Sequence, residues 1–138
     1  MKKLVFFFTL LVLSMSLFGQ TIGTPPGPPI SLDPNMTMVN IHVYGTVTAT
    51  IGNIPVFPLP YVNVNITLWH KANSDDIDPE VIKSWNPFTN TSGYYMLNVW
   101  EPIPKYSLGF HWVEVEVNGQ VEIVYLGQMP TQVDFHFD

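Results

Sequence analysis

The feature that most constrains this chain is a hydrophobic pattern with a period of two. After residue 37, apolar and polar side chains alternate over several short runs, as in Val39-Asn40-Ile41-His42-Val43. Alternation is typical of β-strands with one buried face, because successive side chains point to opposite sides of a strand. Thirteen prolines and nine glycines separate the runs, and no convincing helix is predicted. The sequence therefore predicts an all-β fold: a single Greek-key, immunoglobulin-like β-sandwich of about seven strands.

The first strand shows the pattern most clearly. Its expected inward side chains occupy odd positions: Val39, Ile41, Val43, Val47, Ala49 and Ile51. Gly45 interrupts this row, which predicts a bulge or a close approach of another backbone segment. Prolines follow in residues 55–60 and again in residues 101–104, and both segments are predicted to be breaks between strands.

Further strands are expected later in the chain. The segments 61–69, 80–85 and 94–100 each fit a short strand, and residues 70–79 are polar enough to form a loop. Three apolar residues are expected to open the next strand: Tyr106, Leu108 and Phe110. The last strand is predicted to turn three side chains inward: Val133, Phe135 and Phe137.

An Asn-Gly pair near the C-terminal end predicts a β-hairpin. A two-residue loop would place Val115 opposite Glu122, an apolar residue opposite an acidic one on the same face. A three-residue loop at 117–119 pairs Val115 with Val121 instead and turns Ile123 inward. Because the buried face sets the register of a strand pair, we predict the longer loop.

The N-terminus has the pattern of an export signal. Two lysines precede an apolar run at 4–18, which is about 15 residues long, whereas a spanning helix needs roughly 20. We predict a signal peptide at 1–19, a Pro-rich spacer at 20–37 and a β-sandwich domain at 38–138, with 14–16 as a competing cleavage region. The processed protein is then expected to be secreted, periplasmic or on the cell surface, without a membrane span.

Charge and composition exclude several functions. Without residues 1–19, the chain carries three lysines, no arginine and 11 acidic residues, a formal charge of −8. Such a chain cannot neutralise a row of phosphates, which excludes nucleic acid as a partner. It has no cysteine nucleophile, and it lacks the G-x-S-x-G, H-E-x-x-H, phosphate-loop and dinucleotide motifs. We therefore predict that the protein is not an enzyme.

Four segments combine strand residues with turn residues in a recognisable order: 44–48 (YGTVT), 58–64 (PLPYVNV), 89–97 (TNTSGYYML) and 106–108 (YSL). Together they resemble the carboxypeptidase regulatory-like (transthyretin-like) β-sandwich domains, over about residues 39–138. The resemblance implies a largely non-catalytic accessory or stabilising module of exported and surface proteins. Tyr61 stands where these domains usually have Gly, Asn90 stands where they have an acid, and the connection at 70–87 is longer than usual.

Six aromatic side chains fall on outward positions or at strand ends: Tyr44, Tyr61, Trp69, Tyr94, Trp100 and Trp112. Exposed aromatic rings either stack on sugar rings or pack against a protein partner. We predict that these residues bind a protein partner at the cell surface, with glycan binding as the alternative. An unpaired edge strand offers a second route to a protein partner. The oligomeric state stays open at this point.

Four acidic residues cluster in the predicted loop after the second strand: Asp75, Asp76, Asp78 and Glu80. Carboxylate oxygens gathered in a loop are ligands that Ca²⁺ prefers, although this spacing is not that of an EF-hand. The loop is a candidate calcium site, a solvated acidic loop is the alternative, and no other cofactor is expected. The four histidines share no short metal-ligand spacing and are interpreted as separate residues.

Overall fold

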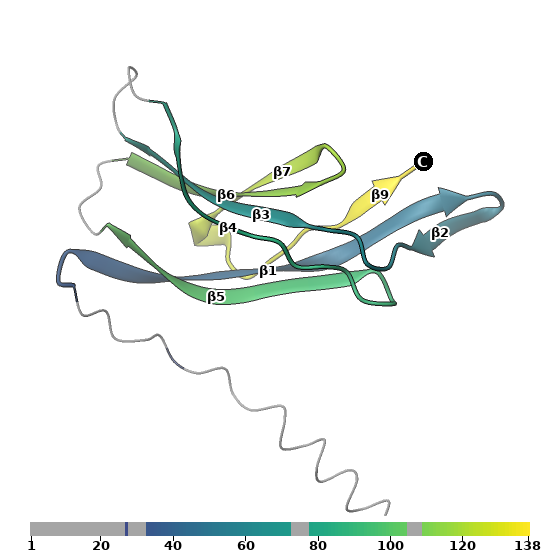
Figure 1. Cartoon of the computed structure of the whole chain (residues 1–138), viewed down its shortest axis with the longest axis horizontal. Coiled ribbons are helices and arrows are strands. Elements are labelled where there is room, and N and C mark those ends of the chain that lie inside the picture. Colours follow the sequence, from purple (N-terminus) through teal and green to yellow (C-terminus); the bar gives the residue numbers. More distant parts are fainter. Residues whose placement is uncertain (1–26, 28–32, 73–77, 105–108) are drawn as a thin grey trace, which may run out of the picture.

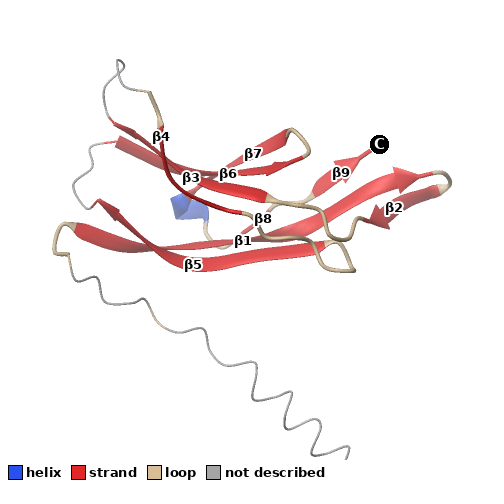
Figure 2. Cartoon of the chain, in the orientation of Figure 1, coloured by secondary structure: helices blue, strands red, loops and turns tan. Residues whose placement is uncertain are grey.

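The computed structural model describes residues 33–72, 78–104 and 109–138, together with Gly27. In these residues the strands form two sheets that pack face to face, and the helical content is one short 3₁₀ turn (Figures 1 and 2). No helix in this part of the chain has the length and hydropathy to cross a membrane. The elements in chain order are β1 (Met36–Ile51), β2 (Ile54–Pro58), β3 (Asn65–Ala72), β4 (Glu80–Trp85), β5 (Tyr94–Pro104), β6 (Gly109–Val117), β7 (Gln120–Tyr125), η1 (Leu126–Gln128), β8 (Thr131–Gln132) and β9 (Phe135–Phe137).

The two sheets have different topologies. The four-stranded sheet is antiparallel throughout, in the order β4-β3-β6-β7. The five-stranded sheet is built around β1, which pairs antiparallel with β5 and β2 and parallel with the short β8 and β9. Val43 and Tyr44 pair with both β5 and β8, so β8 lies on the side of β1 opposite β5. The predicted all-β sandwich is thus confirmed, with nine strands in the described residues where about seven were expected.

The core lies between the sheets and follows the predicted parity. On β1, Ile41, Val43 and Val47 are fully buried, whereas Ile51 lies beyond the core and is exposed. Each large aliphatic side chain buried in this way contributes about 1.5–3 kcal/mol relative to an exposed position. The buried cluster draws on both sheets: Ile41, Val43, Val47, Val64, Ile66, Leu68, Tyr95, Leu97, Ile103, Val113, Val115, Val117, Val124, Val133 and Phe135.

Gly45 marks the point where the C-terminal segment crosses β1. The Val133 N–H donates to the Tyr44 carbonyl (2.8 Å), and a Cβ added at Gly45 would overlap the Val133 carbonyl oxygen. The Tyr95 hydroxyl, buried beside Gly45, donates to the same Val133 carbonyl (2.7 Å). Burial, with a smaller effect from Asp134, raises the pKa of Tyr95, which keeps the hydroxyl a donor. The predicted close approach at Gly45 is confirmed.

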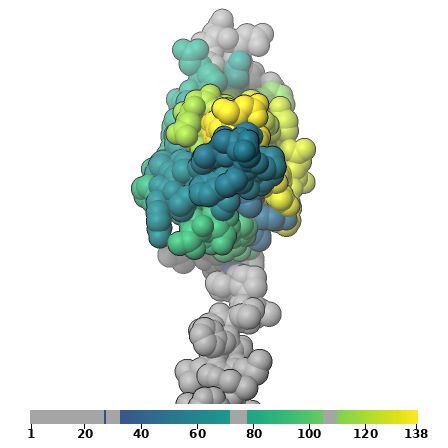
Figure 3. Space-filling view, turned by 90° about the vertical axis from the view of Figure 1, so that its right-hand side faces the viewer, coloured from purple at the N-terminus to yellow at the C-terminus, as the bar shows by residue number. Residues whose placement is uncertain are grey.

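The prolines do not break the sheet as predicted. β2 includes Pro55 and Pro58, and β5 continues through Pro102 and Pro104. Both strands lie at an edge of their sheet, where a residue without an N–H need not donate to a neighbouring strand. The hairpin of β1 and β2 projects at one end of the sandwich, beside the C-terminal residues (Figure 3, blue-teal and yellow).

The predicted polar loop at 70–79 is also shorter than expected. β3 continues to Ala72 because its pairing with β6 extends through His70 and Lys71. Residues 73–77 lie outside the described part of the chain. The predicted strand at 80–85 is confirmed in position. The predicted last strand is shorter than expected, at Phe135–Phe137, and its inward parity is confirmed because Val133 and Phe135 are buried.

The predicted register of the last hairpin is wrong. Val117 pairs with Gln120 across a two-residue loop, in which Asn118 and Gly119 both have positive φ (48° and 84°). These angles are those of the type I′ turn that an Asn-Gly pair favours. The resulting pairing places Val115 opposite Glu122. This pairing is tolerated because β7 is an edge strand, so the Glu122 side chain reaches solvent.

Replacing Gly45 with Ala should destabilise the fold by about 3 kcal/mol or more, because the new methyl group must displace the backbone at Val133. Urea unfolding followed by tryptophan fluorescence measures the change. Gly127→Ala is the matched control, since a Cβ at Gly127 meets no atom within 4 Å. Equal stability of the two variants would contradict the close approach at Gly45.

Candidate functional site

The six predicted aromatic residues do not form one surface. Trp69 on β3 and Trp112 on β6 share the outer face of the four-stranded sheet. Three others lie on the outer face of the five-stranded sheet, on β1 or β5, and point away from the core: Tyr44, Tyr94 and Trp100. Tyr61 precedes β3, is 70% exposed and has a positive φ of 58°. The prediction therefore merges side chains from opposite sides of the sandwich.

An exposed apolar surface covers the outer face of the four-stranded sheet. It combines aromatic and aliphatic side chains from three adjacent strands. We call it the apolar face and define it as Trp69, Phe110, Trp112, Val121, Ile123 and Tyr125. Phe110, Ile123 and Tyr125 are 64%, 54% and 58% exposed. Large exposed apolar patches of this kind mark interaction surfaces.

A row of three rings crosses the apolar face. Trp69 pairs with Trp112, and Trp112 pairs with Tyr125 on β7, so the three residues share one register level. The two tryptophan rings are nearly parallel, with centroids 6.2 Å apart and an interplanar angle of 8°. The Trp112 Nε1–H donates to Glu114 (3.3 Å). Beside the row, Phe110, Trp112, Ile123 and Tyr125 line an open, mostly apolar hollow of about 370 Å³.

Four members of the apolar face were missed by the sequence analysis: Phe110, Val121, Ile123 and Tyr125. Phe110 is expected from the sequence only to help open a strand, and its shared parity with the outward Trp112 is the signal that would have added it. Val121 and Ile123 were turned inward by the wrong hairpin register. The Asn-Gly turn preference alone would have placed both correctly.

The predicted calcium site lies partly outside the described residues. Asp75 and Asp76 fall in the segment 73–77, while Asp78 and Glu80 are exposed at the start of β4. In the described ranges, no group of three or more His, Cys, Asp or Glu could hold a metal ion. Calcium binding stays a prediction.

Two histidines that the sequence analysis treated separately are neighbours. His70 on β3 pairs with His111 on β6, and their rings stack with centroids 4.6 Å apart. The Nε2 atom of each ring is buried and has no hydrogen-bond partner among the described residues. Burial, followed by the charge of His70, lowers the pKa of His111. In stacked imidazole rings the nitrogen lone pairs lie in separate, nearly parallel planes and do not converge on one point. The pair is therefore a packing contact and does not suit a shared metal.

No family model and no curated protein matches the chain. Among solved structures, the crystal structure of the major plantain pollen allergen Pla l 1 is similar over 71% of this chain and 94% of that chain. The two have 17% sequence identity and a TM-score of 0.39.

The His70–His111 pair predicts a pH-dependent stability. Because the pKa of His111 is lowered in the folded chain, the unfolded chain binds the extra proton first. The stabilisation associated with neutral His111 is therefore complete above the unfolded pKa of about 6.5. It declines as the pH falls from there toward the folded pKa. Thermal melts of wild type and His111→Phe at pH 8 and 5.5 measure this effect. Wild type should lose more melting temperature, and equal losses would contradict the prediction.

Proposed function

We propose that this chain is an exported, non-catalytic β-sandwich module with a structural or protein-interaction role at the cell envelope or outside the cell. The predicted signal segment supports export, and the absence of recognisable catalytic motifs from the sequence supports a non-catalytic role. The acidic charge disfavours nucleic acid and anionic lipid as partners.

The observation that carries this proposal is the composition of the apolar face. Its β7 edge consists of Val121 and Ile123 next to Tyr125, all about half exposed. Aliphatic side chains gain free energy when a partner removes them from water, whereas sugar rings are gripped by flat aromatic faces and polar groups. A mixed aliphatic and aromatic surface therefore favours a protein partner.

Carbohydrate binding is the second candidate, and a separate observation favours it. Trp69, Trp112 and Tyr125 lie at one register level across three strands, with the two indoles nearly parallel. Such a row presents several rings to an extended ligand, and Glu114 lies beside it as a hydrogen-bond acceptor.

We also propose that the domain is of the carboxypeptidase regulatory-like (transthyretin-like) type. Two departures from that pattern have a physical explanation. Tyr61, in place of the usual Gly, has the positive φ that favours glycine. Asn90, in place of the usual acid, accepts from the backbone N–H groups of Ser92 and Tyr94 through its Oδ1 (2.9 and 3.0 Å), as a carboxylate oxygen would.

Photo-crosslinking in intact producing cells tests the apolar face. A photo-reactive phenylalanine analogue in place of Ile123 is expected to give a discrete adduct of higher mass. The same analogue in place of Val56, which is at least as exposed on β2, should give none. Adding Tyr125→Ser to the chain that carries the analogue at position 123 should reduce the adduct several-fold, because it removes apolar contact area.

Digestion of the adduct separates the two candidate functions. Loss of the extra mass with a protease supports a protein partner, and loss with a glycosidase mixture supports the glycan alternative. If positions 123 and 56 give the same pattern, the apolar face is not the interaction surface and the proposal is wrong.

A further inference from the structure

β7 is the least protected edge strand of the described sandwich. Exposed edges invite pairing with another chain, and proteins blunt them with prolines, inward charges, bulges or short strands. β2 and β5 contain prolines, and β8 and β9 are only two and three residues long. β4 has a register shift and carries Lys83, which forms an ion pair with the mostly buried Glu101 (3.2 Å). The β7 sequence QVEIVY has none of these features except one acid, Glu122.

The register of the hairpin fixes which backbone groups of β7 point to its free edge. Across a two-residue turn, the first pair, Val117 and Gln120, exchanges hydrogen bonds, and alternate pairs follow this pattern. The N–H and C=O groups of Val121 and Ile123 therefore point away from β6. Consistently, the Tyr125 N–H is bonded to the Gln128 side chain on that side (3.0 Å). In the described residues no other strand pairs with this edge.

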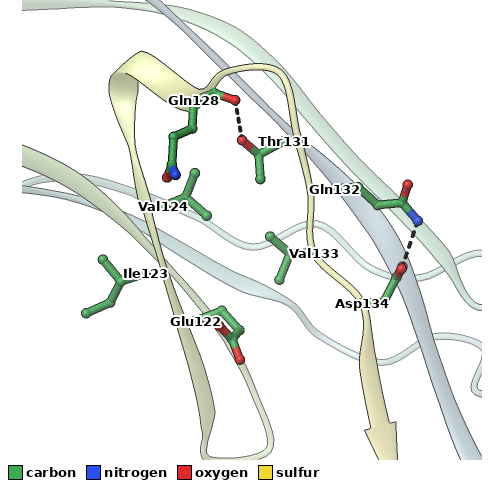
Figure 4. A pocket seen from close by; sticks show the side chains of 8 residues that line it. All are labelled: Glu122, Ile123, Val124, Gln128, Thr131, Gln132, Val133 and Asp134. Atoms are coloured by element: carbon green, nitrogen blue, oxygen red, sulfur yellow. Dashed lines mark hydrogen bonds between the residues drawn. The ribbon is translucent and has the colours of Figure 1, made fainter.

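A strand added to this edge would meet a different surface on each side. Its outward side chains would extend the apolar face beside Val121 and Ile123. Its inward side chains would lie over a polar cleft of about 320 Å³ between β7 and the β8–β9 segment (Figure 4). Glu122 and Asp134 line this cleft from opposite sides, and neither has a cationic partner in the described part of the chain. Asp134 accepts hydrogen bonds from Thr46 and Gln132, so a cation there would add to neutral donors that are already in place.

We propose that β7 binds an extended segment of another protein by strand addition, and that this segment alternates apolar residues with lysine or arginine. The apolar residues would cover the β7 side of the apolar face, and the basic residues would reach the carboxylates of Glu122 and Asp134. This inference rests on the proposed protein-interaction function and specifies the chemistry of its partner. A second copy of this acidic chain fits less well, because its formal charge of −6 repels a like-charged copy.

Fluorescence anisotropy with short labelled peptides tests the proposal on the purified full domain. The probe is Thr-Val-Lys-Ile-Lys-Val-Thr, and the charge control has Glu at both Lys positions. A second control has alternate backbone nitrogens methylated, on the register that faces β7, which removes edge hydrogen bonds and leaves the side chains unchanged. We expect the Lys peptide to bind at least tenfold more tightly than either control.

Two variants of the chain complete the test. Glu122→Lys should reverse the preference, so that the Glu peptide binds more tightly than the Lys peptide. Ile123→Pro should weaken binding at least tenfold, because it removes a donor from the free edge and leaves the pairing with β6 intact. The exposed Val56→Pro on β2 is the control that should leave binding unchanged. Circular dichroism melts verify that each variant is folded.

The outcomes separate this inference from the proposed function. Equal binding of the N-methylated peptide, or binding by neither peptide, overturns strand addition, whereas an adduct at position 123 would still support the apolar face. A dimer of the free chain that Ile123→Pro dissociates would show that a second copy occupies the edge and would also overturn the proposal. Reversal of preference in Glu122→Lys, with loss of binding in Ile123→Pro, supports it.

Discussion

The arrangement of this domain depends on the crossing of the C-terminal segment over Gly45. A side chain at position 45 would exclude the Val133 backbone, and the Tyr95 hydroxyl holds the Val133 carbonyl from inside the core. Because Val133 is fixed there, β8 and β9 pair in parallel with β1 and lie opposite the edge of β7. One contact between backbone segments thus completes the five-stranded sheet and shapes the cleft beside β7.

The two lateral edges of the sandwich differ in how they are protected against pairing with another strand. On the β4–β5 side, Lys83 reaches across to Glu101, and prolines occupy β5, so that edge is closed to other strands. On the β7 side, the inward carboxylate of Glu122 has no such partner in the described residues. An acid left without a cation beside a free backbone edge is a feature that repels copies of this chain and attracts a basic strand.

The alternation of apolar and polar residues predicted much of the fold but could not predict the register of the edge strand β7. The inward rows of β1 and of the C-terminal strand follow from alternation, because both strands face the core along most of their length. The register of β7 could not be derived in this way, since the inner position of an edge strand reaches solvent and accepts Glu122. Alternation also shows that an aromatic residue points outward without showing which sheet it covers. For that reason Tyr44 and Trp112 were grouped, although they lie on opposite sides of the sandwich.

Amide hydrogen exchange along β7 tests the central claim, a free β7 edge, most directly. The amides of Glu122 and Val124 point to β6 in the observed register, whereas those of Val121 and Ile123 point to the free edge. We expect the first two to exchange at least about a hundredfold more slowly than the second two, because only the first two are protected by the ladder. Equal protection of all four amides in the free chain would contradict the register, the free edge, or both.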